Sequence, residues 1–81
     1  MEKEIAVVTH WYGHISVAVL DLKGSVSVGD KIRVKHGETE FEDEIKSMQI
    51  NHKEVSSAEK GDEVAVKLSG KAKEGSKIFK I

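Results

Sequence analysis

The sequence contains no cysteine and no proline among its 81 residues, and aromatic side chains make up only 5% of it. Without cysteine, the chain has no disulfide, no thiolate nucleophile and no cysteine-based zinc site. No apolar run approaches the roughly 20 residues that a membrane-spanning helix needs. The start Met-Glu-Lys-Glu leads into a strand pattern and does not resemble a signal peptide. We therefore expect a soluble, cytoplasmic protein with no membrane contact.

An excess of one charge is also missing. Thirteen basic and 14 acidic side chains leave a formal net charge of -1, so the overall field of the molecule does not attract phosphate backbones. Any contact with a nucleic acid would have to be local. The length corresponds to one small domain. Because no linker or low-complexity tract divides the chain, we expect a single domain over residues 1–81.

Short alternating apolar segments are what the sequence has in abundance. They are typical of β-strands, and they cover residues 5–10, 15–22, 31–35, 64–68 and 77–81. Segments 5–10 and 15–22 are apolar at both parities, which indicates interior strands. In the segment from Thr39 to Ile50, Phe41 and Ile45 share one parity, whereas Met48 and Ile50 share the other. One uninterrupted strand cannot bury all four, so a bulge or bend is expected near Lys46-Ser47.

One local pattern occurs three times, as Val28-Gly-Asp-Lys-Ile32, Lys60-Gly-Asp-Glu-Val64 and Glu74-Gly-Ser-Lys-Ile78. Each copy places glycine, which adopts positive φ easily, before a residue able to hydrogen-bond its own backbone, and then starts an apolar strand. Five to six short strands joined by such corners favour closure, because closure removes unpaired strand edges. We therefore predict an all-β fold, a small closed six-stranded β-barrel, with one short helical turn near residues 56–60.

Residues 10–14 hold two histidines, the only tryptophan and the only tyrosine. If Tyr12-Gly13 is a two-residue hairpin loop, His10 and His14 lie on opposite faces of the ribbon and cannot share a metal. A longer loop would allow it, but no third ligand is near in sequence. We interpret the stretch as a hairpin corner with an exposed aromatic tip, Trp11 and Tyr12, that is available for a partner. No metal site is expected.

Two further patterns are weaker. Gly24-Ser-Val-Ser-Val-Gly-Asp-Lys31 nearly spells a phosphate-binding loop, but an aspartate replaces the required lysine and a strand follows in place of a helix. No nucleotide or other cofactor is therefore expected. Alternating lysine and arginine at 31, 33 and 35 form a basic stripe, and glutamates at 38, 40, 42 and 44 form an acidic one. We interpret both as solvated faces that pair with each other, with RNA contact by the basic stripe as the alternative.

Three segments in order, Leu22–Val34, Ile45–Ile50 and Val55–Leu68, resemble domain 2 of the translational GTPases such as elongation factor Tu. The likeness covers roughly residues 4–81 and is greatest to small stand-alone elongation-factor-like proteins. The chain is more distantly similar to the barrel appended to collagenase-like peptidases. The resemblance implies a six-stranded closed β-barrel. It implies no GTP hydrolysis, since that chemistry belongs to a separate domain of the full-length factors.

In elongation factor Tu, domain 2 also helps to hold the aminoacylated end of tRNA with a glutamate and an arginine. The matching positions here are Gln49 and His52. Glutamine still hydrogen-bonds a sugar hydroxyl, whereas histidine lacks the planar cationic fork of arginine. The resemblance thus implies a non-catalytic binding module that contacts RNA or a protein of the translation machinery, such as the ribosome, tRNA or a protein factor. The alternative is a protein-interaction or regulatory barrel, accessory to a separate enzyme, with no RNA contact. The candidate binding residues are Gln49, His52, Lys31, Arg33, Lys35, Trp11 and Tyr12.

Overall fold

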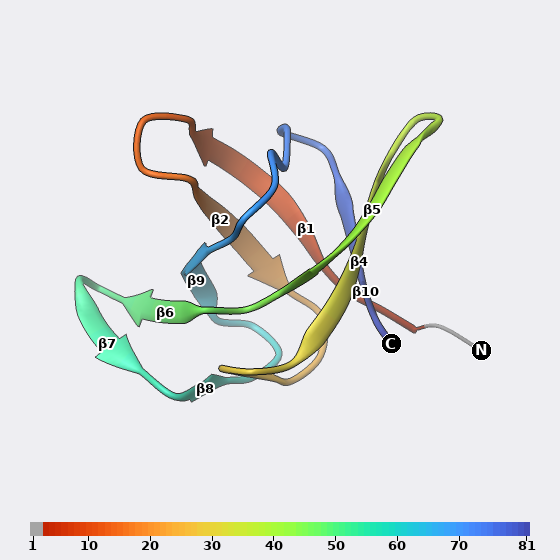
Figure 1. The fold of residues 1–81 in the computed structure, drawn as a ribbon. Helices are drawn as coiled ribbons and strands as arrows, with labels where there is room; N and C mark the ends of the chain where they lie inside the picture. Colours follow the sequence, from red (N-terminus) through yellow and green to blue (C-terminus); the bar gives the residue numbers. More distant parts are fainter. Residues whose placement is uncertain (1–2) are drawn as a thin grey trace.

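The computed structural model describes residues 3–81, and they form ten β-strands and no helix (Figure 1). The strands are β1 (Lys3–Tyr12), β2 (Val17–Leu22), β3 (Val26–Ser27), β4 (Lys31–His36), β5 (Thr39–Glu44), β6 (Ser47–Ile50), β7 (Lys53–Val55), β8 (Ser57–Ala58), β9 (Glu63–Lys67) and β10 (Lys77–Lys80). Eight of them form one antiparallel sheet in the order β5-β4-β10-β1-β2-β9-β6-β7. The other two, β3 and β8, pair as a short ribbon. The all-β prediction is confirmed.

The three repeated corners have the predicted turn geometry. Gly29, Gly61 and Gly75 have φ values of 93°, 94° and 86°. In each turn, the residue after glycine donates its backbone N–H to the carbonyl three residues earlier, over 3.0–3.1 Å. This is the arrangement of a type II turn, which requires positive φ at its third residue. In two of the corners, the aspartate carboxylate also accepts a backbone N–H from the first residue of the turn: Asp30 from Ser27, and Asp62 from Glu59.

The side chains that the alternating pattern predicts to be buried do face the core. Ile32 and Val34 of β4 are buried, while the basic residues between them face outward. Strand β1 departs from simple alternation at two bulges, one near Ile5 and one near Thr9. The first lets the neighbouring residues Ile5 and Ala6 both enter the core. At the second, the Thr9 hydroxyl donates to the Val19 carbonyl at 3.2 Å, and the strand continues toward its hairpin.

A bend separates β5 from β6 at Ile45-Lys46, one residue before the predicted position near Lys46-Ser47. Ile45 exchanges backbone hydrogen bonds with Gly29 and Asp30, of 2.9 and 3.0 Å, and the Lys46 N–H donates to the Lys67 carbonyl at 3.2 Å. The chain thereby crosses from one side of the curled sheet to the other (Figure 1).

The predicted closed six-stranded barrel is not confirmed. The eight-stranded sheet keeps two edges, β5 and β7. The chain passes between the two sides of the sheet through an irregular bend, and a few hydrogen bonds to a corner replace a continuous ladder there. The predicted helical turn near residues 56–60 is wrong. Ser57-Ala58 instead form β8 opposite β3, and Ala58 is buried. A single helical turn has little stability alone, so the pairing with β3 prevails.

One cluster of buried apolar residues lies inside the curl. It draws on nearly every part of the sheet, including Leu20, Ile32, Met48, Val64 and Ile78. On the outside, Glu4 Oε2 lies 2.6 Å from Lys23 Nζ, and this hydrogen bond is the main reason why the pKa of Glu4 falls below its usual 4.5. Within residues 3–81, no helix is long and apolar enough to cross a membrane.

The connection between β9 and β10, residues 68–76, is tied to β5. The Asp43 carboxylate accepts the backbone N–H groups of Ser69 and Gly70 at 2.9 and 2.8 Å. Gly70 itself packs so closely on the Phe41 ring that an added Cβ would lie 2.5 Å from it. These contacts hold the connection against β5.

Replacing Asp43 with alanine is expected to lower the free energy of unfolding by about 1–3 kcal/mol, because hydrogen bonds to a charged acceptor are lost. Urea denaturation followed by tryptophan fluorescence measures this. Glu42→Ala, on the same strand, removes only an ion pair of 3.6 Å with half-exposed partners and should cost under about 1 kcal/mol. Equal losses in the two variants would show that Asp43 does not hold the connection.

Candidate interaction surface

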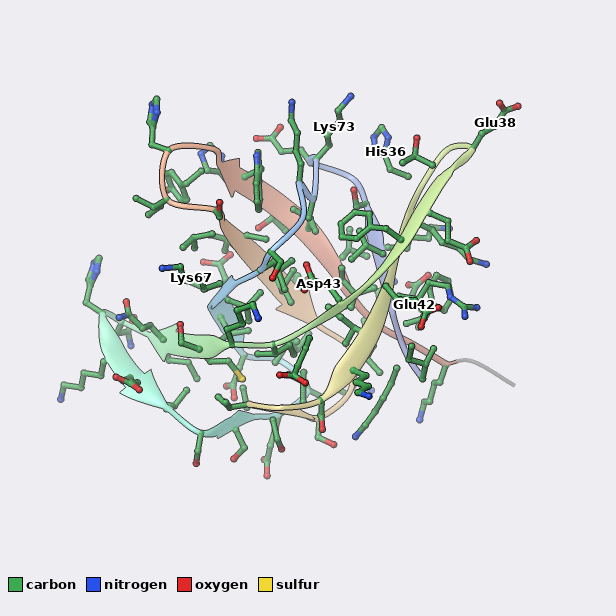
Figure 2. The ribbon with its side chains drawn as sticks, in the orientation of Figure 1. His36, Glu38, Glu42, Asp43, Lys67 and Lys73 are labelled. Atoms are coloured by element: carbon green, nitrogen blue, oxygen red, sulfur yellow. The ribbon has the colours of Figure 1, made fainter. Side chains whose placement is uncertain are left out.

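The outward side chains of β2, β9 and β6 form one continuous surface. The strand registers place Val17 beside Lys67 and then Ser47, and Val19 beside Ala65 and then Gln49. We call these six residues the outer face. Val19 and Ala65, which are paired across β2 and β9, are apolar and half-buried, and Lys67, labelled in Figure 2, is exposed.

This composition differs from the outward side of β4, where every second residue is lysine or arginine. A sheet face in contact with water normally alternates polar residues outward against apolar residues inward. Strand β2 instead places Val17 and Val19, both half-buried, on the outward side. An apolar patch on solvent-facing strands is characteristic of surfaces that contact another protein.

The hairpin between β1 and β2 extends the outer face. Tyr12 pairs with Val17, so residues 13–16 make a four-residue loop, and the two-residue loop considered from the sequence is wrong. Tyr12 and Ile15 are 48% and 58% exposed. Trp11 pairs with Ala18 on the inward side and packs against the core. The expected exposed aromatic tip therefore consists of Tyr12 alone.

His10, beside the hairpin, has an acidic and an aromatic neighbour. His10 Nδ1 lies 3.0 Å from Glu74 Oε1, and its ring lies 4.3 Å from the ring of Tyr12. In the part of the chain from residue 3 onward, no three histidine, aspartate or glutamate side chains gather as metal ligands. His10 thus contacts both Glu74 and Tyr12 at the edge of the outer face.

Two shallow hollows mark the outer face, and Gln49 and Ala65 line both. The first, about 300 Å³, lies toward the hairpin loop beside Ile15 and Val17. The second, about 250 Å³, includes Tyr12 and His52 in its lining. The structure thus brings together three of the residues singled out from the sequence, Tyr12, Gln49 and His52, although 37 to 40 positions separate Tyr12 from the other two.

Backbone geometry explains why His52 lies at this margin. Asn51 and His52 have φ values of 51° and 65° and join β6 to β7 as a two-residue hairpin turn. Both central residues of a type I′ turn need positive φ, which asparagine and histidine adopt more readily than most side chains. The turn projects His52 beside Gln49, at one end of the second hollow.

The basic stripe on β4 lies elsewhere and is balanced by acids. Four strands separate β4 from β6 in the sheet. The register places Lys31, Arg33 and Lys35 opposite three glutamates of β5. Arg33 lies 3.1 Å from Glu40 and 3.6 Å from Glu42, and Lys35 lies 3.7 Å from Glu40. The interpretation of two solvated faces that pair with each other agrees with these contacts.

Sequence reasoning missed the apolar members of the surface, Ile15, Val17, Val19 and Ala65. Their signal was present, because residues 15–22 are apolar at both parities. That pattern indicates an interior strand, but it does not show whether another element covers both faces of the strand. The structure shows an interior strand within the sheet whose second face remains partly open to solvent.

No protein-family model matches the sequence. An uncharacterized protease of Methanocaldococcus jannaschii is 40% identical over 77 residues, which are 94% of this chain and 19% of that protein. The chain therefore spans about a fifth of the length of this relative. Two crystal structures of the C-terminal domain of a protein named as a U32 peptidase, from Geobacillus thermoleovorans, share the fold. The first has a TM-score of 0.86 at 14% identity, and the match covers 94% of this chain and 96% of that domain. The second has a TM-score of 0.89 at 15% identity, and the match covers 98% of this chain and 92% of that domain.

These comparisons overturn the assignment to the elongation factor domain 2 family and the translation function that it implied. Both the sequence relative and the structural neighbours carry peptidase names. The misleading signal was the corner motif, which encodes a type II turn into a strand. That geometry is local and specifies no partner, whereas the alternative of an accessory unit for a separate enzyme agrees better with the comparisons.

Proposed function

We propose that this chain is a non-catalytic accessory domain that binds the catalytic part of a peptidase. The observation that carries the proposal is the match of 94% of the chain to only 19% of a protease. In that protease, the segment that matches this chain is joined to a remainder about four times its size. The fold of an isolated C-terminal domain of a U32 peptidase supports the same arrangement. The proposal assigns peptide hydrolysis to that remainder.

The outer face is the surface that we assign to this contact. Its centre, Val19 and Ala65, is half-buried and apolar, and Tyr12 and Ile15 extend it with exposed apolar area. Interfaces between proteins have such centres, with polar residues around them and with tyrosine enriched. In this arrangement Gln49, His52 and Lys67 form part of the polar margin. Trp11 supports the hairpin from inside, while Lys31, Arg33 and Lys35 lie outside the contact.

The test uses the Methanocaldococcus jannaschii protease from which the segment matching this chain has been deleted. The 81-residue chain is titrated into the deleted protease by isothermal calorimetry, and the cleavage of unstructured peptides is measured for each protein alone and for the mixture. We expect one chain to bind each protease molecule with at least micromolar affinity. We also expect no cleavage by the 81-residue chain alone.

Two results would contradict the proposal. Cleavage of peptides by the purified chain would make it an enzyme in its own right. Failure to bind the deleted protease, when the protease's own excised segment does bind it, would show that this chain serves a different partner. The excised segment is thus the positive control for a correctly folded catalytic part.

A further inference from the structure

A third hollow, of different character, lies at the end of the molecule opposite β3 and β8 (Figure 1). It encloses about 170 Å³ between the β4-β5 hairpin and the connection 68–76. Val34 and Phe41 supply its apolar wall, and His36, Lys71 and Lys73 surround it. Figure 2 shows His36 and Lys73 near one another, from these two separate parts of the chain. We call this the cationic pocket.

The pocket is built from elements that other contacts hold in place. Asp43 binds the amides of Ser69 and Gly70, just before Lys71. On the far side, the buried Ser76 hydroxyl donates to the Lys73 carbonyl at 2.6 Å, and the Ser76 N–H donates to the same oxygen at 3.1 Å. The backbone that carries both lysines is therefore anchored at each end.

The two lysines and the histidine around the pocket do not pair with acids in the part of the chain that the structure describes. Across residues 3–81, no ion pair involves His36, Lys71 or Lys73. Glu38, in the neighbouring hairpin turn, is not among the residues that line the pocket and extends away from it in Figure 2. On the outward side of β4, by contrast, Arg33 and Lys35 both pair with glutamates. The cationic pocket is thus a local positive site on a molecule with a net charge of -1.

We propose that the cationic pocket binds the C-terminal end of a polypeptide, with the last side chain against Val34 and Phe41 and the terminal carboxylate beside Lys71, Lys73 and His36. A cavity of about 150 Å³ is known to admit a benzene-sized group, so the volume here suits one apolar side chain. Charge-assisted hydrogen bonds from ammonium groups suit a carboxylate. This inference rests on the pocket alone and does not require the peptidase partner.

Polypeptide is favoured over RNA for two reasons. A strand of nucleic acid presents a phosphate at each nucleotide and needs a basic path that continues beyond one site. Here Arg33 and Lys35, the members of the basic stripe on β4 nearest to the pocket, are paired with glutamates, so no such path leads away from the pocket. The single apolar cavity also matches one side chain next to one carboxylate.

The experiment is an NMR titration of the ¹⁵N-labelled 81-residue chain with the peptide acetyl-Gly-Gly-Leu. This peptide is used as the free acid and as the C-terminal amide. A longer amidated peptide with an internal glutamate is the third ligand. We expect the acid to bind with a dissociation constant of roughly 1 mM and to shift amides within 34–41 and 69–76. The amide and the internal glutamate peptide should bind at least about fivefold more weakly.

The variant Lys71→Gln/Lys73→Gln should weaken binding of the acid at least about fivefold. The control Lys46→Gln/Lys60→Gln removes the same number of charges from exposed positions elsewhere and should leave binding unchanged. The amide spectrum of each variant shows whether it is folded. Equal affinity for the acid and the amide, or equal loss in the two double variants, would overturn the proposal. So would tight binding of the internal glutamate peptide, or displacement of the acid by a short RNA oligonucleotide at the same amides.

Discussion

Replacing Ala65 with arginine is expected to weaken binding of the chain to the deleted protease by about thirtyfold or more, while the chain stays folded. Ala65 lies at the centre of the outer face, between Val19 and Gln49, and lines both of its hollows. Arginine there projects a long, charged side chain into the centre of the contact. Residues at the centre of an interface typically account for about 2 kcal/mol or more each, which corresponds to this change in affinity. Calorimetric titration measures it.

Ser57→Arg is the matched control, because it adds the same side chain at an exposed position of β8. It should leave the affinity within about a factor of two. Tyr12→Ala, which removes exposed apolar area from the edge of the face, should give an intermediate loss. If Ala65→Arg binds as well as the unaltered chain, the peptidase contact lies on another face of the molecule.

Replacing Leu20 with alanine is expected to lower the free energy of unfolding by about 2–5 kcal/mol. Leu20 is fully buried in β2, between Val8 of β1 and Val64 of β9. Its neighbours belong to three paired strands and cannot collapse onto the space that the truncation leaves. For a chain of this size, the loss corresponds to a fall in the melting temperature of roughly 10–40 °C. Differential scanning calorimetry measures this directly.

Val19→Ala is the control for this prediction, since Val19 is the preceding residue of the same strand and faces outward. It should cost under about 1 kcal/mol, because its side chain is only half-buried. The pair also separates stability from binding. Leu20→Ala acts on folding, whereas Val19→Ala changes the outer face and should weaken the peptidase contact more than it weakens the fold. Similar losses of stability in both variants would contradict the assignment of an inner and an outer face to β2.

Local features of the fold were predictable from the sequence. The three glycine corners, the outward lysines of β4 and the bend at Ile45-Lys46 all follow from residues within a few positions of one another. A type II turn needs only a glycine at its third position, and the change of parity after Ile45 can be read directly. The hairpin at Tyr12 was predicted too, but its loop length was not, because the bulge at Thr9 shifts the register of the two strands.

The interaction surface was predictable only in part. Tyr12, Gln49 and His52 were singled out for separate reasons, and the structure places them around one hollow. The apolar centre of that surface was missed because alternation along a strand does not say which face another element covers. The cationic pocket was also invisible, since His36 and Lys73 are 37 positions apart and meet only through the connection that Asp43 holds.

The sequence by itself determined the strands, their corners and their inward faces, because each depends on nearby residues and on the period of two of an extended chain. The tertiary structure alone decided that the sheet remains open, that Ser57-Ala58 pair with β3, and which outward side chains share a surface. These outcomes depend on contacts between residues far apart in the chain. The free energy of each of these contacts depends on burial, on strand pairing and on the course of the connections. A local sequence pattern does not contain that information.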